Sequence, residues 1–230
     1  MAIYALADLH LSFGTDKPMD VFGDAWGDYT NKIKTNWERL VTPDDAVIIP
    51  GDVSWATYIE DALDDFKFIQ SLPGKKFIIK GNHDYWWTTL NKMENFLTEN
   101  GLTSIKILNN TATEFEDTAI CGTRGWWYKE GQKEEDEKIL DRERKRLVLA
   151  LEAASKLKKD KIIVGLHYPP LDKESENRDF FDILKAYNVD TCVYGHLHSF
   201  AHKNAIVGEV EGIKLKLVSG DFVNFEPILV

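Results

Sequence analysis

The segment Lys76-Phe77-Ile78-Ile79-Lys80-Gly81-Asn82-His83-Asp84 decides the fold, because an apolar, β-rich run ends there abruptly in polar residues. Such a run is typical of a buried strand, and the glycine and asparagine mark its end. We therefore expect a strand that presents polar side chains at its carboxyl end, with Asn82 and His83 as the functional candidates among them.

The same pattern recurs at four other places in the chain. Apolar runs lead into Asp8-Leu9-His10, Gly51-Asp52, His167 and Gly195-His196-Leu197-His198. Of the 6 histidines, only His202 does not stand at such a strand end. A lone histidine in this position is most often structural. Several of them together favour a shared metal site.

Helical periodicity between these strands indicates an α/β fold. Apolar residues recur at helical spacing in 31–40, 58–70, 88–100 and 180–187. Alternating strand and helix patterns are the signature of βαβ units. The charged segment from about 133 to 159 predicts one long helix, and we interpret its mixture of Lys, Arg and Glu as a solvated face.

Further strands are predicted at 104–108, 118–122, 161–166, 191–194, 205–210 and 213–218, and the last two are expected to form a hairpin. Residues 11–29 form a long segment without regular structure that includes Trp26. Loops of this length are often functional. We expect this one to overhang the first metal ligands.

Length and composition indicate the number of domains, the location of the protein and the state of its cysteines. A chain of 230 residues without a Pro/Gly/Ser-rich linker predicts a single domain spanning residues 1–230. No signal segment and no apolar run long enough for a membrane helix is evident, so we expect a cytoplasmic protein without membrane association. Cys121 and Cys192 lie in apolar runs and are expected to be buried free thiols.

The formal net charge of −10 disfavours extended nucleic acid as a partner, because duplex binding depends on Lys and Arg set against phosphates. A local basic groove is compatible with an acidic total. The oligomeric state is left open by the sequence.

The strand-end residues form a mixed set of oxygen and nitrogen ligands. Such a set suits Zn, Mn or Fe better than the all-oxygen sites of calcium. More ligands are present than one ion needs, so two divalent or trivalent transition metal ions are expected. Two ions about 3.5 to 4 Å apart can share a bridging hydroxide that attacks a phosphoryl group. The predicted chemistry is therefore phosphoester hydrolysis.

These blocks resemble, in the same order from residue 8 to residue 198, those of the calcineurin-like metallophosphoesterase superfamily. The resemblance implies a four-layer αββα sandwich, in which two mixed β-sheets are flanked by helices. It also implies that the ligand-bearing loops gather at one edge, at the carboxyl ends of the strands.

The resemblance also assigns roles to individual residues. One ion would be held by Asp8, His10 and His198, the other by Asn82, His167 and His196, and Asp52 would bridge the two. His83 would not bind metal and would donate a proton to the leaving oxygen or clamp the phosphate, a role worth about 10² to 10⁴ in rate. Asp84 is expected to support His83, with a simple cap or turn residue as the alternative.

One departure from the family narrows the substrate. Protein serine/threonine phosphatases of this superfamily follow the second block with Asp-Arg-Gly, whereas Gly51-Asp52 here continues as Val53-Ser54-Trp55. This weakens a protein-phosphatase assignment and favours a small phosphomonoester or phosphodiester, for example a nucleotide.

Tryptophans cluster beside the blocks, at Trp55, Trp86, Trp87, Trp126 and Trp127. Our hypothesis is that rings such as Trp86 and Trp126 wall the substrate site, and that Arg124 contacts phosphate with its forked guanidinium. Core packing of the tryptophans and an ordinary surface salt bridge for Arg124 are the alternatives.

Two other functions compete with a small-molecule phosphohydrolase. A nuclease of the same superfamily would need a basic channel, against which the acidic charge argues. A non-catalytic scaffold with this fold would be expected to lack a ligand or the catalytic histidine, whereas this sequence keeps every block.

Overall fold

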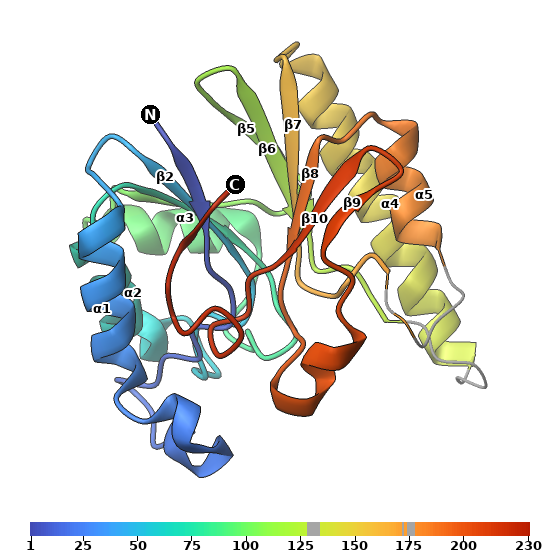
Figure 1. Ribbon diagram of the computed structural model, residues 1–230. Helices are drawn as coiled ribbons and strands as arrows, with labels where there is room; N and C mark the ends of the chain where they lie inside the picture. Colours follow the sequence, from blue (N-terminus) through green and yellow to red (C-terminus); the bar gives the residue numbers. More distant parts are fainter. Residues whose placement is uncertain (128–133, 172, 174–177) are drawn as a thin grey trace.

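Two β-sheets pack against each other between two layers of helices (Figure 1). The computed structural model describes residues 1–127, 134–171, 173 and 178–230. The arrangement confirms the predicted α/β sandwich of two mixed sheets flanked by helices.

The first sheet has the strand order β11-β1-β2-β3-β4. Its strands are β1 (Ile3–Ala5), β2 (Ala46–Pro50), β3 (Lys75–Ile79), β4 (Ile105–Ile107) and β11 (Ile228–Leu229). Strands β1 to β4 are parallel, and β11 pairs antiparallel with β1 at the edge.

The second sheet has the order β5-β6-β7-β8-β10-β9. Its strands are β5 (Ala112–Phe115), β6 (Thr118–Thr123), β7 (Lys161–Leu166), β8 (Thr191–Tyr194), β9 (Gly208–Val210) and β10 (Ile213–Leu217). Strands β6, β7, β8 and β10 are parallel, and the edge strands β5 and β9 are antiparallel to their neighbours.

Helices cover the outer face of each sheet (Figure 1). The first sheet is covered by α1 (Tyr29–Leu40), α2 (Leu63–Ser71) and α3 (Leu90–Glu99), and the second by α4 (Glu134–Lys156) and α5 (Asp179–Ala186). Short 3-10 turns are η1 (Met19–Phe22), η2 (Asp24–Trp26), η3 (Glu60–Ala62) and η4 (Ser199–Asn204).

The residues of β2 show why its sequence is apolar throughout. Val47 and Ile49 point into the core beneath the helices, whereas Ala46 and Ile48 point into the core between the two sheets. Successive side chains of a strand face opposite sides, so a central parallel strand is buried on both faces. The run is therefore continuous rather than alternating.

The two sheets approach each other closely at Gly122 and Gly165. A Cβ atom on Gly165 would lie 2.3 Å from Cδ1 of Ile79 in the opposite sheet. A Cβ atom on Gly122 would lie 2.1 Å from the carbonyl oxygen of Gly165 in the neighbouring strand. Any larger residue at these positions would separate the layers that position the site.

Some boundaries differ from the predicted ones. The edge strands β5 and β11 were not predicted, because two to four residues with pairing on one side leave little pattern. The hairpin of β9 and β10 is confirmed, but β9 begins at Gly208 rather than at the predicted residue 205. The helix expected from 58 starts as η3 and becomes α-helical at Leu63.

The long charged helix is confirmed as α4, while its expected first residue, Lys133, lies outside the described residues. We interpreted the charged residues of this helix as a solvated face, and this is wrong for Glu143, which is fully buried. Cys121 and Cys192 are buried free thiols, as predicted, and burial raises the pKa of Cys121 to about 12. Among the helices of the described ranges, none combines the length and apolarity needed to cross a membrane.

The close approach of the sheets leads to a stability prediction. We expect Gly122→Ala to lower the free energy of unfolding by about 1 to 3 kcal/mol, because its methyl group would meet backbone that cannot rotate away. Gly27→Ala is the control, since its Cβ would meet nothing nearer than 3.3 Å. Urea denaturation of both variants measures the effect, and equal stability of the two would contradict it.

Candidate metal centre

The seven predicted ligands meet at the carboxyl ends of parallel strands from both sheets. The first sheet supplies Asp8 and His10 after β1, Asp52 after β2 and Asn82 after β3, and the second supplies His167 after β7 and His196 and His198 after β8. Carboxyl ends of parallel strands share one edge of a sheet, and this is where α/β folds place their sites.

Asp8, His10 and His198 form the first group. Each offers a ligand atom, and these atoms all lie within 4.8 Å of one another. His198 Nε2 lies 3.5 Å from Asp8 Oδ1, and the rings of His10 and His198 are 5.4 Å apart. The spacing is suitable for one cation held by a carboxylate and two imidazoles.

Asn82, His167 and His196 form the second group around the amide of Asn82. Its Oδ1 atom lies 2.6 Å from His167 Nε2 and 2.9 Å from His196 Nδ1. The backbone N–H of His196 donates to the Asp8 carboxylate, which ties this group to the first.

Asp52 lies between the two groups. Its Oδ2 atom is 3.7 Å from Nε2 of His10 and 3.5 Å from Nε2 of His167. Its Oδ1 atom accepts a hydrogen bond of 2.8 Å from the backbone N–H of His83, which fixes the carboxylate's orientation. One oxygen thus faces imidazoles from both groups, as a bridging ligand must.

The donor atoms of the second group fit a cation. His167 Nδ1 lies 3.1 Å from the carbonyl oxygen of Pro50, and because a carbonyl only accepts, this nitrogen carries the proton. The lone pair on Nε2 therefore faces Asn82 Oδ1, another acceptor, at 2.6 Å. A cation shared by the two atoms would turn this repulsion into coordination. His10 Nδ1 is also buried without a hydrogen-bond partner in the described chain.

Burial keeps three of the histidines neutral. It lowers the pKa of His10 to about 3, of His167 to about 4 and of His196 to about 3, from an ordinary 6.5. The positive charge of His198 adds to this effect at all three. Neutral imidazoles are the form that binds metal, so these side chains need lose no proton at neutral pH.

His198 and the two carboxylates behave differently. Burial disfavours the charged form of His198, but Asp8 and Asp221 outweigh it and raise its pKa to about 10. Burial likewise opposes ionisation of Asp8, but protonated His198 overrides it and holds the pKa of Asp8 well below its usual range. Burial, together with the charges of Asp8 and Asp84, raises the pKa of Asp52 well above normal.

Several ligands hold unusual backbone conformations. Asp8, His10, Asp52 and His196 have φ values of 58°, 43°, 52° and 72°, in a region that residues with side chains seldom adopt. Such conformations persist only where the surrounding structure enforces them, and they cluster at functional sites.

Glycines beside the ligands leave room for them. A Cβ atom on Gly81 would lie 2.1 Å from Asp52 Oδ1, and one on Gly195 would lie 2.5 Å from Asp8 Oδ2. The glycines of the Gly81-Asn82 and Gly195-His196 pairs thus allow the loops of different strands to touch.

His83 lies beside the ligands without joining either group. Its half-buried ring stands 4.6 Å from the ring of Trp55 and 5.7 Å from that of His10. Its Nδ1 atom is 3.4 Å from the Tyr85 hydroxyl. An imidazole in this position is available to a bound molecule.

Asp84 has a different environment from the one we expected. Its buried carboxylate accepts hydrogen bonds from the backbone N–H groups of Asp52, Val53 and Gly81 and from Nε1 of Trp86. In the described structure no hydrogen bond joins it to His83. Asp84 therefore fastens the loop after β2 to the loop after β3, and the cap-like alternative fits better than direct support of His83.

The three residues proposed to contact substrate, Trp86, Trp126 and Arg124, are largely engaged with other protein groups. Trp86 is only 2% exposed and packs on Phe66, so its position favours core packing. Trp126 is half-buried, 5.4 Å from the ring of Tyr168. Arg124 lies over the Trp126 ring and pairs with the buried Glu143 at 3.1 Å.

Other aromatic residues border the ligands directly. Trp55 stacks on His10 with ring centres 5.0 Å apart, and Tyr168 lies 4.2 Å from the ring of His196. Trp26 stands 5.6 Å from His10 and 5.7 Å from His198, which confirms that the 11–29 segment overhangs the first ligands.

Sequence reasoning missed Asp221, whose Oδ1 atom lies 2.7 Å from Nδ1 of His198. Carboxylates in this position orient metal-binding histidines and increase their basicity. The signal was present, because Ser219-Gly220-Asp221 follows the strand β10 as the other blocks follow theirs.

Comparison with known proteins agrees with this geometry. A sequence model of the family described as calcineurin-like phosphoesterase matches residues 1–200. No curated protein sequence matches the chain.

Solved structures share the fold at low sequence identity. Phosphopantetheinyl hydrolase from Mycobacterium tuberculosis aligns over 100% of this chain and 95% of its own, with 14% identity and a TM-score of 0.61. A protein of unknown function from Aquifex aeolicus covers 99% of this chain and 95% of its own, with 17% identity and a TM-score of 0.54. A protein from Thermus thermophilus covers 99% and 97%, with 15% identity and a TM-score of 0.56.

The environments of the histidines predict how the metal-free protein titrates. We expect His10, His167 and His196 to stay neutral down to about pH 4, whereas His198 stays protonated to near its pKa of about 10. NMR titration of the imidazole rings measures this, with the urea-unfolded chain as the control. Titration of all four near 6.5 in the folded protein would contradict the burial and pairing described above.

The signs of the stability effects follow from these pKa values. A depressed histidine pKa removes stability as the pH falls below the unfolded value of 6.5, because the unfolded state binds the proton more readily. His198 acts oppositely: its contribution is complete below 6.5 and is lost as the pH rises through about 10.

Proposed function

The chain belongs to the calcineurin-like phosphoesterase family, and from this premise we propose that it is a two-metal hydrolase of small phosphomonoesters or phosphodiesters, nucleotides among them. The observation that carries the proposal is the position of Asp52 Oδ2, 3.7 Å from His10 and 3.5 Å from His167. A carboxylate oxygen between two ligand groups is what a pair of cations requires.

In the proposed site Asp8, His10 and His198 would hold one ion, Asn82, His167 and His196 would hold the other, and Asp52 would be shared by both. Manganese, iron and zinc suit this mixed oxygen and nitrogen set. When bound, the ions supply an activated water nucleophile and neutralise charge on the phosphoryl oxygens.

His83 is the proposed proton donor to the leaving oxygen. Its ring borders His10 and Trp55 and is half-buried, so it can reach a molecule bound at the ligands. Burial lowers its pKa, and the attraction of Asp8 opposes this shift. An anionic phosphoryl group beside the ring would also favour the protonated form that a general acid needs.

The surroundings of the site support a small substrate. Trp26, Trp55 and Tyr168 crowd the ligands with aromatic rings. The net charge of −10 likewise argues against the nuclease alternative. A neighbour in fold is named phosphopantetheinyl hydrolase, which agrees with hydrolysis of a phosphoester.

A metal-by-substrate panel tests the proposal. The protein is stripped of metal, reloaded with Mn²⁺, Fe²⁺ or Zn²⁺ and assayed with p-nitrophenyl phosphate, bis(p-nitrophenyl) phosphate and cyclic AMP. We expect metal-dependent hydrolysis that falls to near background in Asp52→Asn, since an amide oxygen bridges two cations poorly. Asp44→Asn on the exposed surface is the control. Metal binding without hydrolysis of any ester would favour the non-catalytic scaffold instead.

Substitutions at His83 and Asp84 are expected to affect different properties, catalysis at His83 and stability at Asp84. His83→Ala should reduce kcat by about 10² to 10⁴ and change the melting temperature little, because in the described structure its half-buried ring has no hydrogen bond shorter than 3.4 Å. Asp84→Asn should lower the free energy of unfolding by about 1 to 3 kcal/mol, because its amide nitrogen would face backbone donors. Steady-state kinetics and thermal denaturation of both variants measure this. A His83→Ala protein with unchanged kcat would rule out the assigned role.

A further inference from the structure

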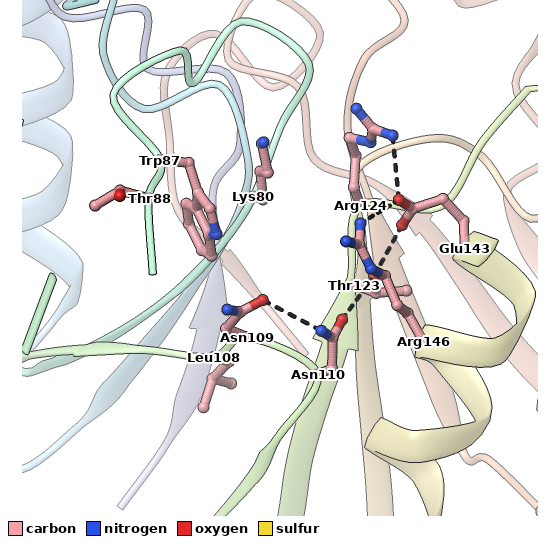
Figure 2. A pocket seen from close by; sticks show the side chains of 10 residues that line it. All are labelled: Lys80, Trp87, Thr88, Leu108, Asn109, Asn110, Thr123, Arg124, Glu143 and Arg146. Carbon is pink, nitrogen blue, oxygen red and sulfur yellow. Dashed lines mark hydrogen bonds and ion pairs between the residues drawn. The ribbon is translucent and has the colours of Figure 1, made fainter. Parts of the chain in front are cut away.

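A cationic pocket lies beside the metal centre, at the carboxyl ends of β3 and β6. It has a volume of about 240 Å³ and is lined by Lys80, Arg124, Glu143 and Arg146, together with Trp87 and Asn109. Figure 2 shows Lys80 and Trp87 on one side of it, and Arg124, Glu143 and Arg146 on the other. Nothing in the proposed hydrolytic step uses this pocket.

The arginine side of the pocket is preorganised by one buried carboxylate. Glu143 is fully buried, and its Oε1 atom accepts from Arg124 Nη2 at 3.1 Å and from Arg146 Nη1 at 2.6 Å. Its Oε2 atom accepts from the Thr123 hydroxyl at 3.2 Å. Two guanidinium groups are thus held in place before any ligand arrives, which reduces the entropy lost on binding.

The charge of the pocket is not balanced. Lys80 makes no ion pair or hydrogen bond with the residues that the structure describes. Glu143 is the one carboxylate among the lining residues, against three cationic side chains, and Asp84 outside the lining adds a second negative charge that acts on Lys80. This positive excess stands in a chain whose net charge is −10. A local cationic pocket in an acidic protein attracts small anions while the rest of the surface repels large ones.

The pocket and the metal centre are built on the same backbone. Lys80 is separated from Asn82 by one residue at the end of β3. The carbonyl oxygen of Arg124 accepts the backbone N–H groups of His167 and Tyr168. The pocket and the ligands therefore stand at the same edge of the sheets, on loops that share backbone hydrogen bonds.

We propose that this pocket binds a second phosphate group of the substrate whose phosphoester is cleaved at the metal centre. The inference rests on the proposed function and narrows it to substrates with two phosphate groups. The guanidinium groups of arginine can donate paired hydrogen bonds to phosphate oxygens, and the ammonium group of Lys80 adds a positive charge. Arg124 thus keeps its predicted phosphate contact, but with the remote phosphate rather than the reacting one.

The alternative is that the pocket is only a brace that fastens α4 to β6. Such a brace needs Arg124, Glu143 and Arg146, but it does not need Lys80, which none of them contacts through a hydrogen bond or ion pair in the described chain. Lys80 therefore distinguishes an anion site from a brace.

Calorimetric titration of the metal-free protein with inorganic pyrophosphate at low salt tests the pocket itself. We expect Lys80→Gln and Arg146→Gln to raise Kd about tenfold or more, while Lys80→Arg retains binding because it keeps the cation. Lys92→Gln, at an exposed lysine outside the pocket, is the control and should bind as the wild type does. A Lys80→Gln protein with unchanged Kd would overturn the proposal.

Kinetics of the Mn²⁺-loaded protein test the link to the substrate. Lys80→Gln should raise KM for adenosine 3′,5′-bisphosphate about tenfold and leave KM and kcat for p-nitrophenyl phosphate unchanged. Equal effects on both substrates, or none on the bisphosphate, would overturn the assignment of the pocket to substrate. Absence of any hydrolysis by the wild type would instead refute the proposed function, whereas the pyrophosphate titration would still decide whether the pocket binds anions.

Discussion

The structure depends on one buried carboxylate that faces imidazoles from both sheets. Asp52 comes from the first sheet, and its Oδ2 atom lies 3.5 Å from His167, which comes from the second. Burying acidic and imidazole groups together is costly unless their charges are balanced. In the metal-free protein the balance is reached by protons, through a raised pKa at Asp52 and at His198. Cations at the same place would balance the charges without those protons.

The positions of these groups require the two sheets to lie close together and in register. Glycines at 122 and 165 allow the sheets to approach, and Gly81 and Gly195 allow the ligand loops to touch. The carboxylate of Asp84 then joins the loops after β2 and β3 through backbone donors. Stability and ligand geometry therefore depend on the same contacts, while His83 remains outside them.

Continuous apolar runs that end in polar residues predicted the parallel strands of an α/β fold. The two-sheet sandwich and the convergence of the ligands at one edge were implied by the resemblance to the calcineurin-like superfamily. The sequence did not predict the contacts made by the residues that flank the ligands. Asp84 was adjacent to His83 in sequence, yet its oxygens are engaged by backbone N–H groups that only the folded loops bring near. Trp86 and Trp55 looked equivalent, but one packs beneath the site and the other stacks on His10. Glu143 looked like part of a solvated helix face, and only packing against β6 reveals the pocket that it organises.

In the proposed site two cations would lie on either side of Asp52. Anomalous diffraction from crystals grown with Mn²⁺ tests it most directly. We expect two peaks that share Asp52, one bound by Asp8, His10 and His198 and the other by Asn82, His167 and His196. A single peak, or peaks remote from Asp52, would contradict it.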